Sequence, residues 1–147
     1  MKPFKHINAR TVNEAVNALG AGKTDIIAGG TDLLGTLKDN ILPDYPSAVV
    51  NIKTVPGLDY IRHEDGMLKI GALTRLSDIS EDAGVKKNYT ALAQAAKSVG
   101  SPHIRDMGTI GGTLAQLPRC WYFRKPENRF PCNRKGGSEC FAILGDN

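Results

Sequence analysis

The chain has 147 residues, of which 41% are hydrophobic and 23% charged, and its formal net charge is +4. This composition is that of an ordinary soluble globular protein. The basic residues are spread along the chain, with a modest cluster only between Arg119 and Lys135, so nucleic acid is not an expected partner. No apolar run approaches the length of about 18 residues that a membrane span needs, and the N-terminus lacks the apolar region of a signal peptide, which predicts a cytoplasmic protein.

The first 54 residues alternate between strand and helix signals. Thr11 and Glu14 have the spacing of a capping box at the start of a helix, and a β-branched run with Val49 and Val50 indicates a buried strand. The pattern predicts a small β-α-β-α-β lobe over residues 1–54. Its strands are expected at residues 4–6, 25–28 and 48–52, and its helices at residues 12–19 and 33–38.

The character of the sequence changes near residue 55, where a Pro-Gly connector begins. Residues 60–63 and 67–70 flank Asp65-Gly66, which predicts a β-hairpin. Thr74 is expected to cap a short helix that runs through Ile79, and residues 89–99 have the apolar spacing of a second helix. We therefore expect a second lobe over residues 55–118, with a ligand in the crevice between the two lobes.

A first glycine segment, Ala28-Gly29-Gly30-Thr31-Asp32-Leu33, connects the expected strand at residues 25–28 to the expected helix at residues 33–38. A strand that leads through a glycine turn into a helix places unpaired backbone amides and the helix dipole where an anion can bind. Thr31 or Asp32 can cap the helix. The spacing is not that of a Rossmann dinucleotide-binding fingerprint.

A second glycine segment, Gly108-Thr109-Ile110-Gly111-Gly112-Thr113, follows Arg105 by a few residues. Consecutive free amides in a glycine-rich turn form a concavity that suits phosphate oxygens, and the hydroxyls of Thr109 and Thr113 can donate to the same oxygens. Two such segments in one small chain suggest a single diphosphate-bearing ligand held between them.

The chain resembles the FAD-binding medium subunit of molybdenum hydroxylases, the family of xanthine dehydrogenase, aerobic carbon monoxide dehydrogenase and 4-hydroxybenzoyl-CoA reductase. The resemblance rests on three segments, AGGTDL at residues 28–33, IGALT at 70–74 and SPHIRDMGTIGG at 101–112. It implies an α+β fold with two lobes, the N-terminal one of α/β type, that bind FAD between them. The FAD-binding residues that it implies are Ile27, Ala28, Gly29, Gly30, Thr31, Asp32, Leu33, Thr74, Ile104, Gly108, Thr109, Gly111, Gly112 and Thr113.

The resemblance also implies which subunits the chain would assemble with. A molybdenum-cofactor subunit would carry the substrate chemistry and a [2Fe–2S] subunit would pass electrons to the flavin, so no catalytic side chain is expected here. The sequence departs from the usual family pattern at two positions. Thr113 stands where the family usually has Asn, and His103 where it usually has Gln. Family members continue well beyond the second glycine segment, so we expect this chain to be a fragment, a truncated product or one piece of a split subunit.

The last stretch, residues 119–147, contains Cys120, Cys132 and Cys140 among basic residues. Three cysteines close to one end do not suit a secreted disulfide framework. The close cysteine pair typical of zinc sites is absent, whereas iron–sulfur clusters accept wider spacing. The stretch resembles an insertion in the 4-hydroxybenzoyl-CoA reductase type of flavin subunit, which holds a [4Fe–4S] cluster on four cysteines. The three cysteines would form an incomplete ligand set.

The sequence therefore predicts the FAD-binding electron-transfer subunit of a molybdenum-dependent hydroxylase or dehydrogenase, or its N-terminal portion. Two alternatives stay open. One is an FAD-binding module without turnover on its own, and the other is a small iron–sulfur or zinc structural protein in which the glycine segments are only turns.

Overall fold

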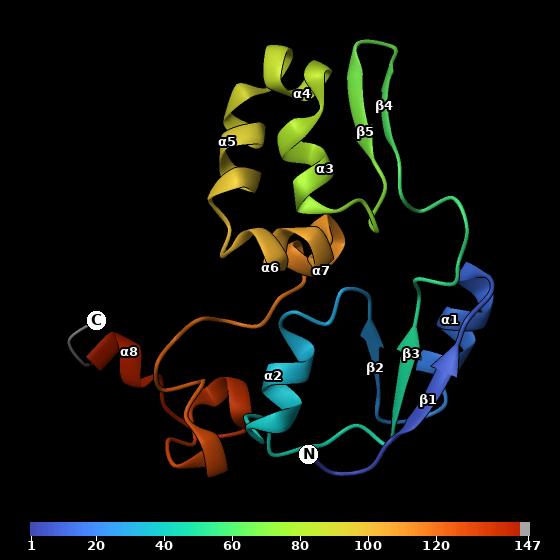
Figure 1. Cartoon of the computed structure of the whole chain (residues 1–147). Coiled ribbons are helices and arrows are strands. Elements are labelled where there is room, and N and C mark those ends of the chain that lie inside the picture. Colours follow the sequence, from blue (N-terminus) through green and yellow to red (C-terminus); the bar gives the residue numbers. More distant parts are fainter. Residues whose placement is uncertain (145–147) are drawn as a thin grey trace.

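The structure of the chain is a computed structural model, in which residues 1–144 are described. The chain forms a lower lobe around a three-stranded sheet, an upper lobe of helices with a hairpin, and a C-terminal segment beside the lower lobe (Figure 1). The elements of the first lobe are β1 (Lys5–Asn8), α1 (Val12–Leu19), β2 (Thr24–Ile27), α2 (Leu33–Lys38) and β3 (Ala48–Asn51).

The sheet of the first lobe is parallel throughout, with the strand order β1-β3-β2. All four residues of the central strand β3 are buried, and Val49 and Val50 have no exposed surface. Val50 packs in a core cluster with Ala9, Ala15 of α1 and Val55. The predicted β-α-β-α-β order is confirmed, and the apolar residues Ala48, Val49 and Val50 suit a parallel strand that is buried on both faces.

The N-terminus of α1 shows why the sequence starts a helix there. The Thr11 hydroxyl accepts a hydrogen bond from the Glu14 amide at 3.1 Å, as a helix cap should. The Glu14 carboxylate accepts from the Arg10 amide at 2.7 Å, one residue earlier than the reciprocal bond of a capping box. Both bonds satisfy backbone donors that would otherwise lack a partner.

The second lobe consists of an antiparallel hairpin and a group of short helices. The hairpin has the predicted Asp65-Gly66 turn, and both turn residues have positive φ angles, 54° and 74°. Leu76, Ile79, Val85, Ala93 and Ala96 form the core of this lobe. Its elements are β4 (Ile61–Glu64), β5 (Met67–Ile70), α3 (Leu76–Glu81), α4 (Ala83–Asn88), α5 (Thr90–Ser98), α6 (Pro102–Met107) and α7 (Ile110–Leu114).

Three of these helices, α4, α6 and α7, differ from the sequence prediction, which had no helix there. Helix α4 begins at Asp82, whose carboxylate accepts from the Val85 amide at 2.8 Å. Helix α6 begins at Ser101, whose hydroxyl accepts from the Ile104 amide at 3.3 Å, and Pro102 occupies its first turn. A capping residue followed by Pro is a recognised start signal, so the sequence did carry a sign of α6.

Thr74 does not cap α3, so this part of the sequence prediction was wrong. The cap position belongs to Arg75, which makes no side-chain capping bond. The Thr74 hydroxyl donates instead to the carbonyl oxygen of Tyr60 at 3.0 Å. Thr74 thus ties the start of α3 to the residue that directly precedes β4, the first strand of the hairpin.

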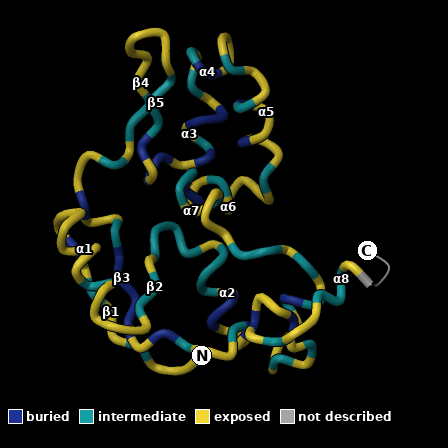
Figure 2. The backbone as a smooth tube through the Cα atoms, turned by 180° about the vertical axis from the view of Figure 1, so that it is seen from behind, coloured by how far each residue is buried: buried dark blue, intermediate teal, exposed yellow. Residues whose placement is uncertain are grey.

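The C-terminal segment packs against the first lobe rather than standing apart. Its elements are η1 (Pro126–Asn128), η2 (Asn133–Lys135) and α8 (Phe141–Leu144). Phe123 and Cys132 are buried against Ile41, which follows α2. Figure 2 shows this third group of buried positions next to α2, separate from the buried positions of β3 and α3. In the part of the chain that the structure describes, no helix is both long and apolar enough to cross a bilayer.

Candidate functional site

The two glycine segments, far apart in the sequence, lie against each other between the lobes. A Cβ atom on Gly29 would lie 1.9 Å from the carbonyl oxygen of Met107 and 3.2 Å from the Cα of Gly108. Only glycine permits this approach of backbone to backbone. The junction of α6 and α7 therefore rests directly on the loop between β2 and α2 (Figure 1).

The first glycine segment leaves a row of backbone donors without a protein acceptor. Within residues 1–144, the amides of Gly29, Gly30, Thr31 and Asp32 donate to no other residue. Gly30 has a φ angle of +73°, a left-handed conformation that turns the chain before α2. Successive free amides around a left-handed residue form an anion-binding concavity, so this segment has the geometry expected of a phosphate cradle.

The second glycine segment uses its amides differently, because residues 110–113 form the first turn of α7. The Ile110 and Gly111 amides donate to carbonyl oxygens on the chain before α3, and the next two donate to Thr109. The predicted row of free amides is therefore not present over residues 110–113. The acceptors are Thr74 O, Ala72 O, Thr109 Oγ1 and Thr109 O, at 2.9 to 3.2 Å.

The Thr113 hydroxyl, which was expected to face a phosphate, and the nearby Arg105 guanidinium both have partners inside the protein. The Thr113 hydroxyl donates to the carbonyl oxygen of Thr109 at 2.9 Å. The Arg105 guanidinium donates to the carbonyl oxygens of Val99 and Gly100 at 3.0 and 3.2 Å, where it closes the end of α5. Thr109 itself keeps a backbone amide that donates to no described residue.

A cleft of about 490 Å³ opens between the lobes and is bordered by Gly29 and Thr109, one from each glycine segment. Lys53 and Arg75 border it as well, and neither forms an ion pair with a described residue. The acidic residues Asp59 and Asp78 also reach the cleft. The rest of the lining is Thr54, Val55, Pro56, Leu73 and Met107.

Sequence reasoning missed most of this lining, although it placed the ligand between the lobes. Lys53 follows the carboxyl end of β3, the edge at which parallel sheets bind their ligands. That rule was a usable signal for Lys53. Arg75 had no comparable signal, because its backbone pairs with Thr109, a residue distant in the sequence.

The other predicted residues lie around the cleft rather than in its lining. Ile27, Ala28 and Leu33 are half-buried at the end of β2 and the start of α2. Thr74 is buried and bonded to Tyr60. Ile104, on α6, is 38% exposed and lies over Gly100, where a Cβ would be 3.1 Å from its Cγ2.

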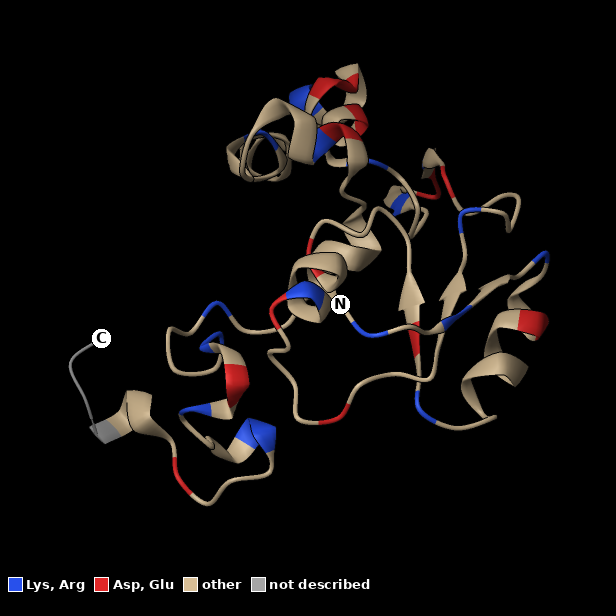
Figure 3. Cartoon of the chain, turned by 60° about the horizontal axis from the view of Figure 1, so that its bottom comes forward, with Lys and Arg blue, Asp and Glu red and all other residues tan. Residues whose placement is uncertain are grey.

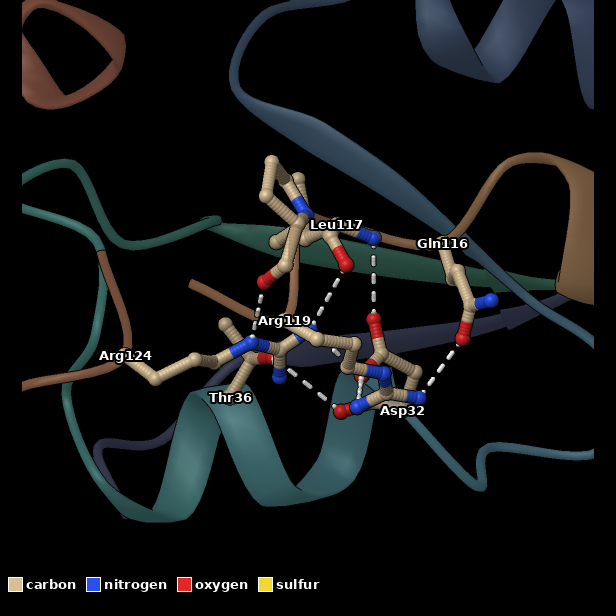
Figure 4. A network of polar contacts seen from close by, with 7 residues as sticks. Asp32, Thr36, Gln116, Leu117, Arg119 and Arg124 are labelled. Atoms are coloured by element: carbon tan, nitrogen blue, oxygen red, sulfur yellow. Dashed lines mark hydrogen bonds and ion pairs between the residues drawn. The ribbon is translucent and has the colours of Figure 1, made fainter. Parts of the chain in front are cut away.

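Asp32 has a role that the sequence did not indicate (Figure 4). Its Oδ1 accepts from Arg119 and from Arg124, both at 2.8 Å, and its Oδ2 accepts from the Leu117 amide at 3.1 Å. It makes no capping bond to α2, although it occupies the cap position. The carboxylate therefore joins the first glycine segment to the chain that leads into the cysteine region.

The three cysteines are free thiols that border one small cavity of about 130 Å³. Tyr122, Phe130 and Phe141 pack edge to face or tilted beside it, with ring centroids 5.3 to 5.8 Å apart. Among residues 1–144, no three His, Cys, Asp or Glu side chains are grouped to hold a metal ion. Figure 3 shows several Lys and Arg residues on this segment, as the sequence indicated.

Comparison with known proteins gives a match along almost the whole chain. Residues 2–144 match the family described as the FAD binding domain in molybdopterin dehydrogenase. The chain is 40% identical over 118 residues to the nicotinate dehydrogenase FAD-subunit of Eubacterium barkeri. It is 35% identical over 148 residues to the aldehyde oxidoreductase FAD-binding subunit PaoB of Escherichia coli K12. Among solved structures, carbon monoxide dehydrogenase from Hydrogenophaga pseudoflava matches with a TM-score of 0.72 at 34% identity.

The extent of these matches differs between the relatives. The nicotinate dehydrogenase and carbon monoxide dehydrogenase matches each cover 78% of this chain, whereas the PaoB match covers 99% and so includes the cysteine segment. The chain spans 39% of the nicotinate dehydrogenase subunit, 45% of PaoB and 40% of the carbon monoxide dehydrogenase chain. The match to carbon monoxide dehydrogenase confirms the predicted mixed fold of helices and sheet.

Proposed function

The chain belongs to the family of FAD binding domains in molybdopterin dehydrogenases, and from this membership we propose that it is an FAD-binding electron-transfer component of a multi-subunit molybdenum-dependent hydroxylase or dehydrogenase. In this proposal a molybdenum-cofactor subunit carries the substrate chemistry, and a [2Fe–2S] subunit passes electrons to the flavin. The relatives named above as FAD-subunits support such an assembly. A cytoplasmic location, expected from the sequence, belongs to the same proposal.

The observation that carries this proposal is the contact of the two glycine segments at the edge of a cleft. The free amides of the first segment, from Gly29 to Asp32, fit the oxygens of a diphosphate. Thr109 borders the cleft from the other lobe, and Lys53 and Arg75 supply positive charge there without an ion pair to any residue in the described range 1–144. A volume of about 490 Å³ lies within the range of about 300–1,000 Å³ that is typical of small-molecule sites.

When bound, FAD supplies reversible electron transfer, which is chemistry that protein side chains do not provide. The chain's own residues bind and orient the cofactor. Gly30 holds the turn that aims the amides, and the Gly29–Met107 contact fixes the distance between the lobes. No side chain of this chain is assigned a catalytic role.

Matched glycine variants test this assignment. Gly30 and Gly66 have φ angles of 73° and 74°, so alanine at either position introduces similar backbone strain. Gly66 lies in the hairpin turn, where an added Cβ would meet nothing within 4 Å. We expect Gly30→Ala to weaken FAD binding by at least about tenfold, because the strained turn re-aims its amides. Gly66→Ala should bind FAD like the parent chain.

Fluorescence titration with FAD and thermal unfolding of all three proteins give the comparison. Equal FAD affinity in the two variants, at equal stability, would remove the first glycine segment from the FAD site. Failure of the parent chain to bind FAD would remove the proposed function itself.

The cysteine cavity favours a second cofactor, and we propose that Cys120, Cys132 and Cys140 are three ligands of a [4Fe–4S] cluster. The proposal is supported by the resemblance of this segment to the cluster-binding insertion and by the position of all three thiols at one cavity; within residues 1–144 the thiols are not grouped as the ligands of a bound metal would be. Anaerobic reconstitution with iron and sulfide, followed by iron analysis, tests it. Incorporation of no iron, with all three thiols protected from alkylation, would assign the cysteines to packing alone.

A further inference from the structure

The Asp32 carboxylate is directed toward the C-terminal segment, where Leu117, Arg119 and Arg124 donate to it (Figure 4). Asp32 is not among the described residues that border the cleft. Its side chain is 15% exposed, and that of Arg124 is 21% exposed, whereas Arg119 is 62% exposed. Because solvent weakens exposed ion pairs, the bond to Arg124 is the main one of the two.

Arg124 holds the neighbouring turn of the chain together. Its guanidinium donates to two main-chain carbonyls of that turn as well as to Asp32. Its backbone amide donates to the carbonyl oxygen of Cys120 at 2.9 Å. A planar guanidinium with several acceptors fixes a geometry that a lysine cannot reproduce. The acceptors of the guanidinium are Pro118 O, Leu117 O, Thr36 Oγ1 and Asp32 Oδ1, at 2.8 to 3.2 Å.

Electrostatics give a reason for this arrangement. The Asp32 backbone amide belongs to the cradle, where a diphosphate would bring negative charge. A carboxylate facing the same diphosphate would repel it, and two arginines on the other side both neutralise the carboxylate and hold it away. The residue thus contributes its backbone amide to the first glycine segment and its side chain to the contact with the C-terminal segment.

We infer that Asp32 is a positioning residue that couples the flavin cradle to residues 117–124, and through Arg124 to Cys120. The inference rests on the proposed function for the identity of the ligand. It differs from the sequence-based expectation for Asp32, which made it one of the FAD-binding residues. The coupling is reciprocal, so FAD in the cradle orders residues 117–124, and loosening those residues weakens FAD binding.

Hydrogen exchange, measured by mass spectrometry on the whole chain with and without FAD, measures the coupling between the first glycine segment and residues 117–124. In Asp32→Asn, one carboxylate oxygen becomes an NH₂ group that must face another donor, either the Leu117 amide or a guanidinium. We expect exchange over residues 117–124 to rise by about tenfold or more, because a charge-assisted bond is replaced by a repulsive contact. Exchange in the β4–β5 hairpin should stay unchanged.

Arg124→Lys separates positioning from direct binding, since Arg124 does not border the cleft. A positioning role predicts that both Asp32→Asn and Arg124→Lys weaken FAD binding, and that FAD slows exchange over residues 117–124 in the parent chain but not in the variants. Asp44→Asn is the matched control. It breaks an ion pair with Lys23 of similar length, 2.7 Å, that is largely exposed and remote from the cradle.

The outcomes discriminate clearly. Loss of FAD affinity in Asp32→Asn alone, with unchanged exchange over residues 117–124, would make Asp32 a direct ligand and overturn the inference. Faster exchange over all segments alike would reduce Asp32 to a general stabilising residue and overturn it too. If the parent chain binds no FAD, the proposed function fails and the reciprocal coupling fails with it, whereas the exchange of Asp32→Asn without FAD still decides whether Asp32 positions residues 117–124.

Discussion

The two glycine segments have similar sequences but do different things in the structure. The first, residues 28–33, keeps free amides around a left-handed Gly30. The second, residues 108–113, folds into the start of α7, and the amides of residues 110–113 donate hydrogen bonds to other groups of the protein. A glycine pair therefore marks close approach of backbone, and only the hydrogen bonds around it tell whether the approaching group is a ligand or another part of the chain.

Gly29 makes the close contact between the first glycine segment and the start of the second, and disrupting this contact should have the largest effect. Gly29→Ala would place a Cβ 1.9 Å from the Met107 carbonyl oxygen, and neither backbone can yield without moving the lobes. We expect a loss of about 3 kcal/mol or more in the free energy of unfolding, together with loss of FAD binding. Urea unfolding and FAD titration measure the two effects.

Gly35→Ala is the control for this variant. An added Cβ at Gly35, within α2, would meet nothing within 4 Å. It should raise the free energy of unfolding by about 0.5–1 kcal/mol, because alanine is the better helix former. A Gly29→Ala protein as stable as the parent chain would contradict the backbone contact between the segments.

The adjacent glycines of the second segment give a finer test. A Cβ on Gly111 would lie 2.8 Å from the Ala72 carbonyl oxygen, whereas one on Gly112 would meet only the Thr109 hydroxyl at 3.1 Å. We expect Gly111→Ala to cost about 1–3 kcal/mol of stability and Gly112→Ala to stay within about 1 kcal/mol of the parent chain. Thermal unfolding of both variants checks this difference.

FAD titration of the same two variants tests whether the second segment serves packing rather than phosphate binding. If the second segment serves packing, Gly112→Ala should bind FAD with an affinity close to that of the parent chain. A large loss of affinity at unchanged stability would make the second segment a phosphate cradle like the first, as the sequence alone predicted.

The sequence predicted the features that depend on neighbouring residues. The parallel lobe, the hairpin at Asp65-Gly66 and the helix capped by Thr11 all follow from patterns a few residues long. Helix α7 was not predicted because glycine is a poor helix former, so Gly111 and Gly112 indicated a turn. The Thr109 cap and the contact of this segment with the chain before α3 stabilise its helical form.

The part of the site that could not be predicted depends on pairs distant in the sequence. Asp32 meets the Leu117 amide 85 positions later and Arg124 92 positions later. No local pattern distinguishes Arg119 and Arg124 from the other basic residues of the C-terminal segment. The same holds for Arg75, whose place at the cleft follows from pairing with Thr109.

The smallest expected effect concerns Asp25, on the strand that leads into the first glycine segment and in register with the buried Val49. Burial raises the pKa of the Asp25 carboxyl above its ordinary value of 3.8. The folded chain therefore holds this proton more tightly than the unfolded chain does. As the pH rises from 3.8 through the raised pKa, stability falls, because the folded state must then carry a desolvated charge.

Asp25→Asn removes this charge and keeps the shape of the side chain. We expect the variant to have a slightly higher Tm than the parent chain at pH 7 and no advantage below pH 3.8, where both side chains are neutral. Thermal unfolding across this pH range measures the difference. FAD affinity at pH 7 should not change, since Asp25 does not border the cleft. A weaker affinity would show that the strand leading into the first segment, and not only its free amides, sets the geometry of the cradle.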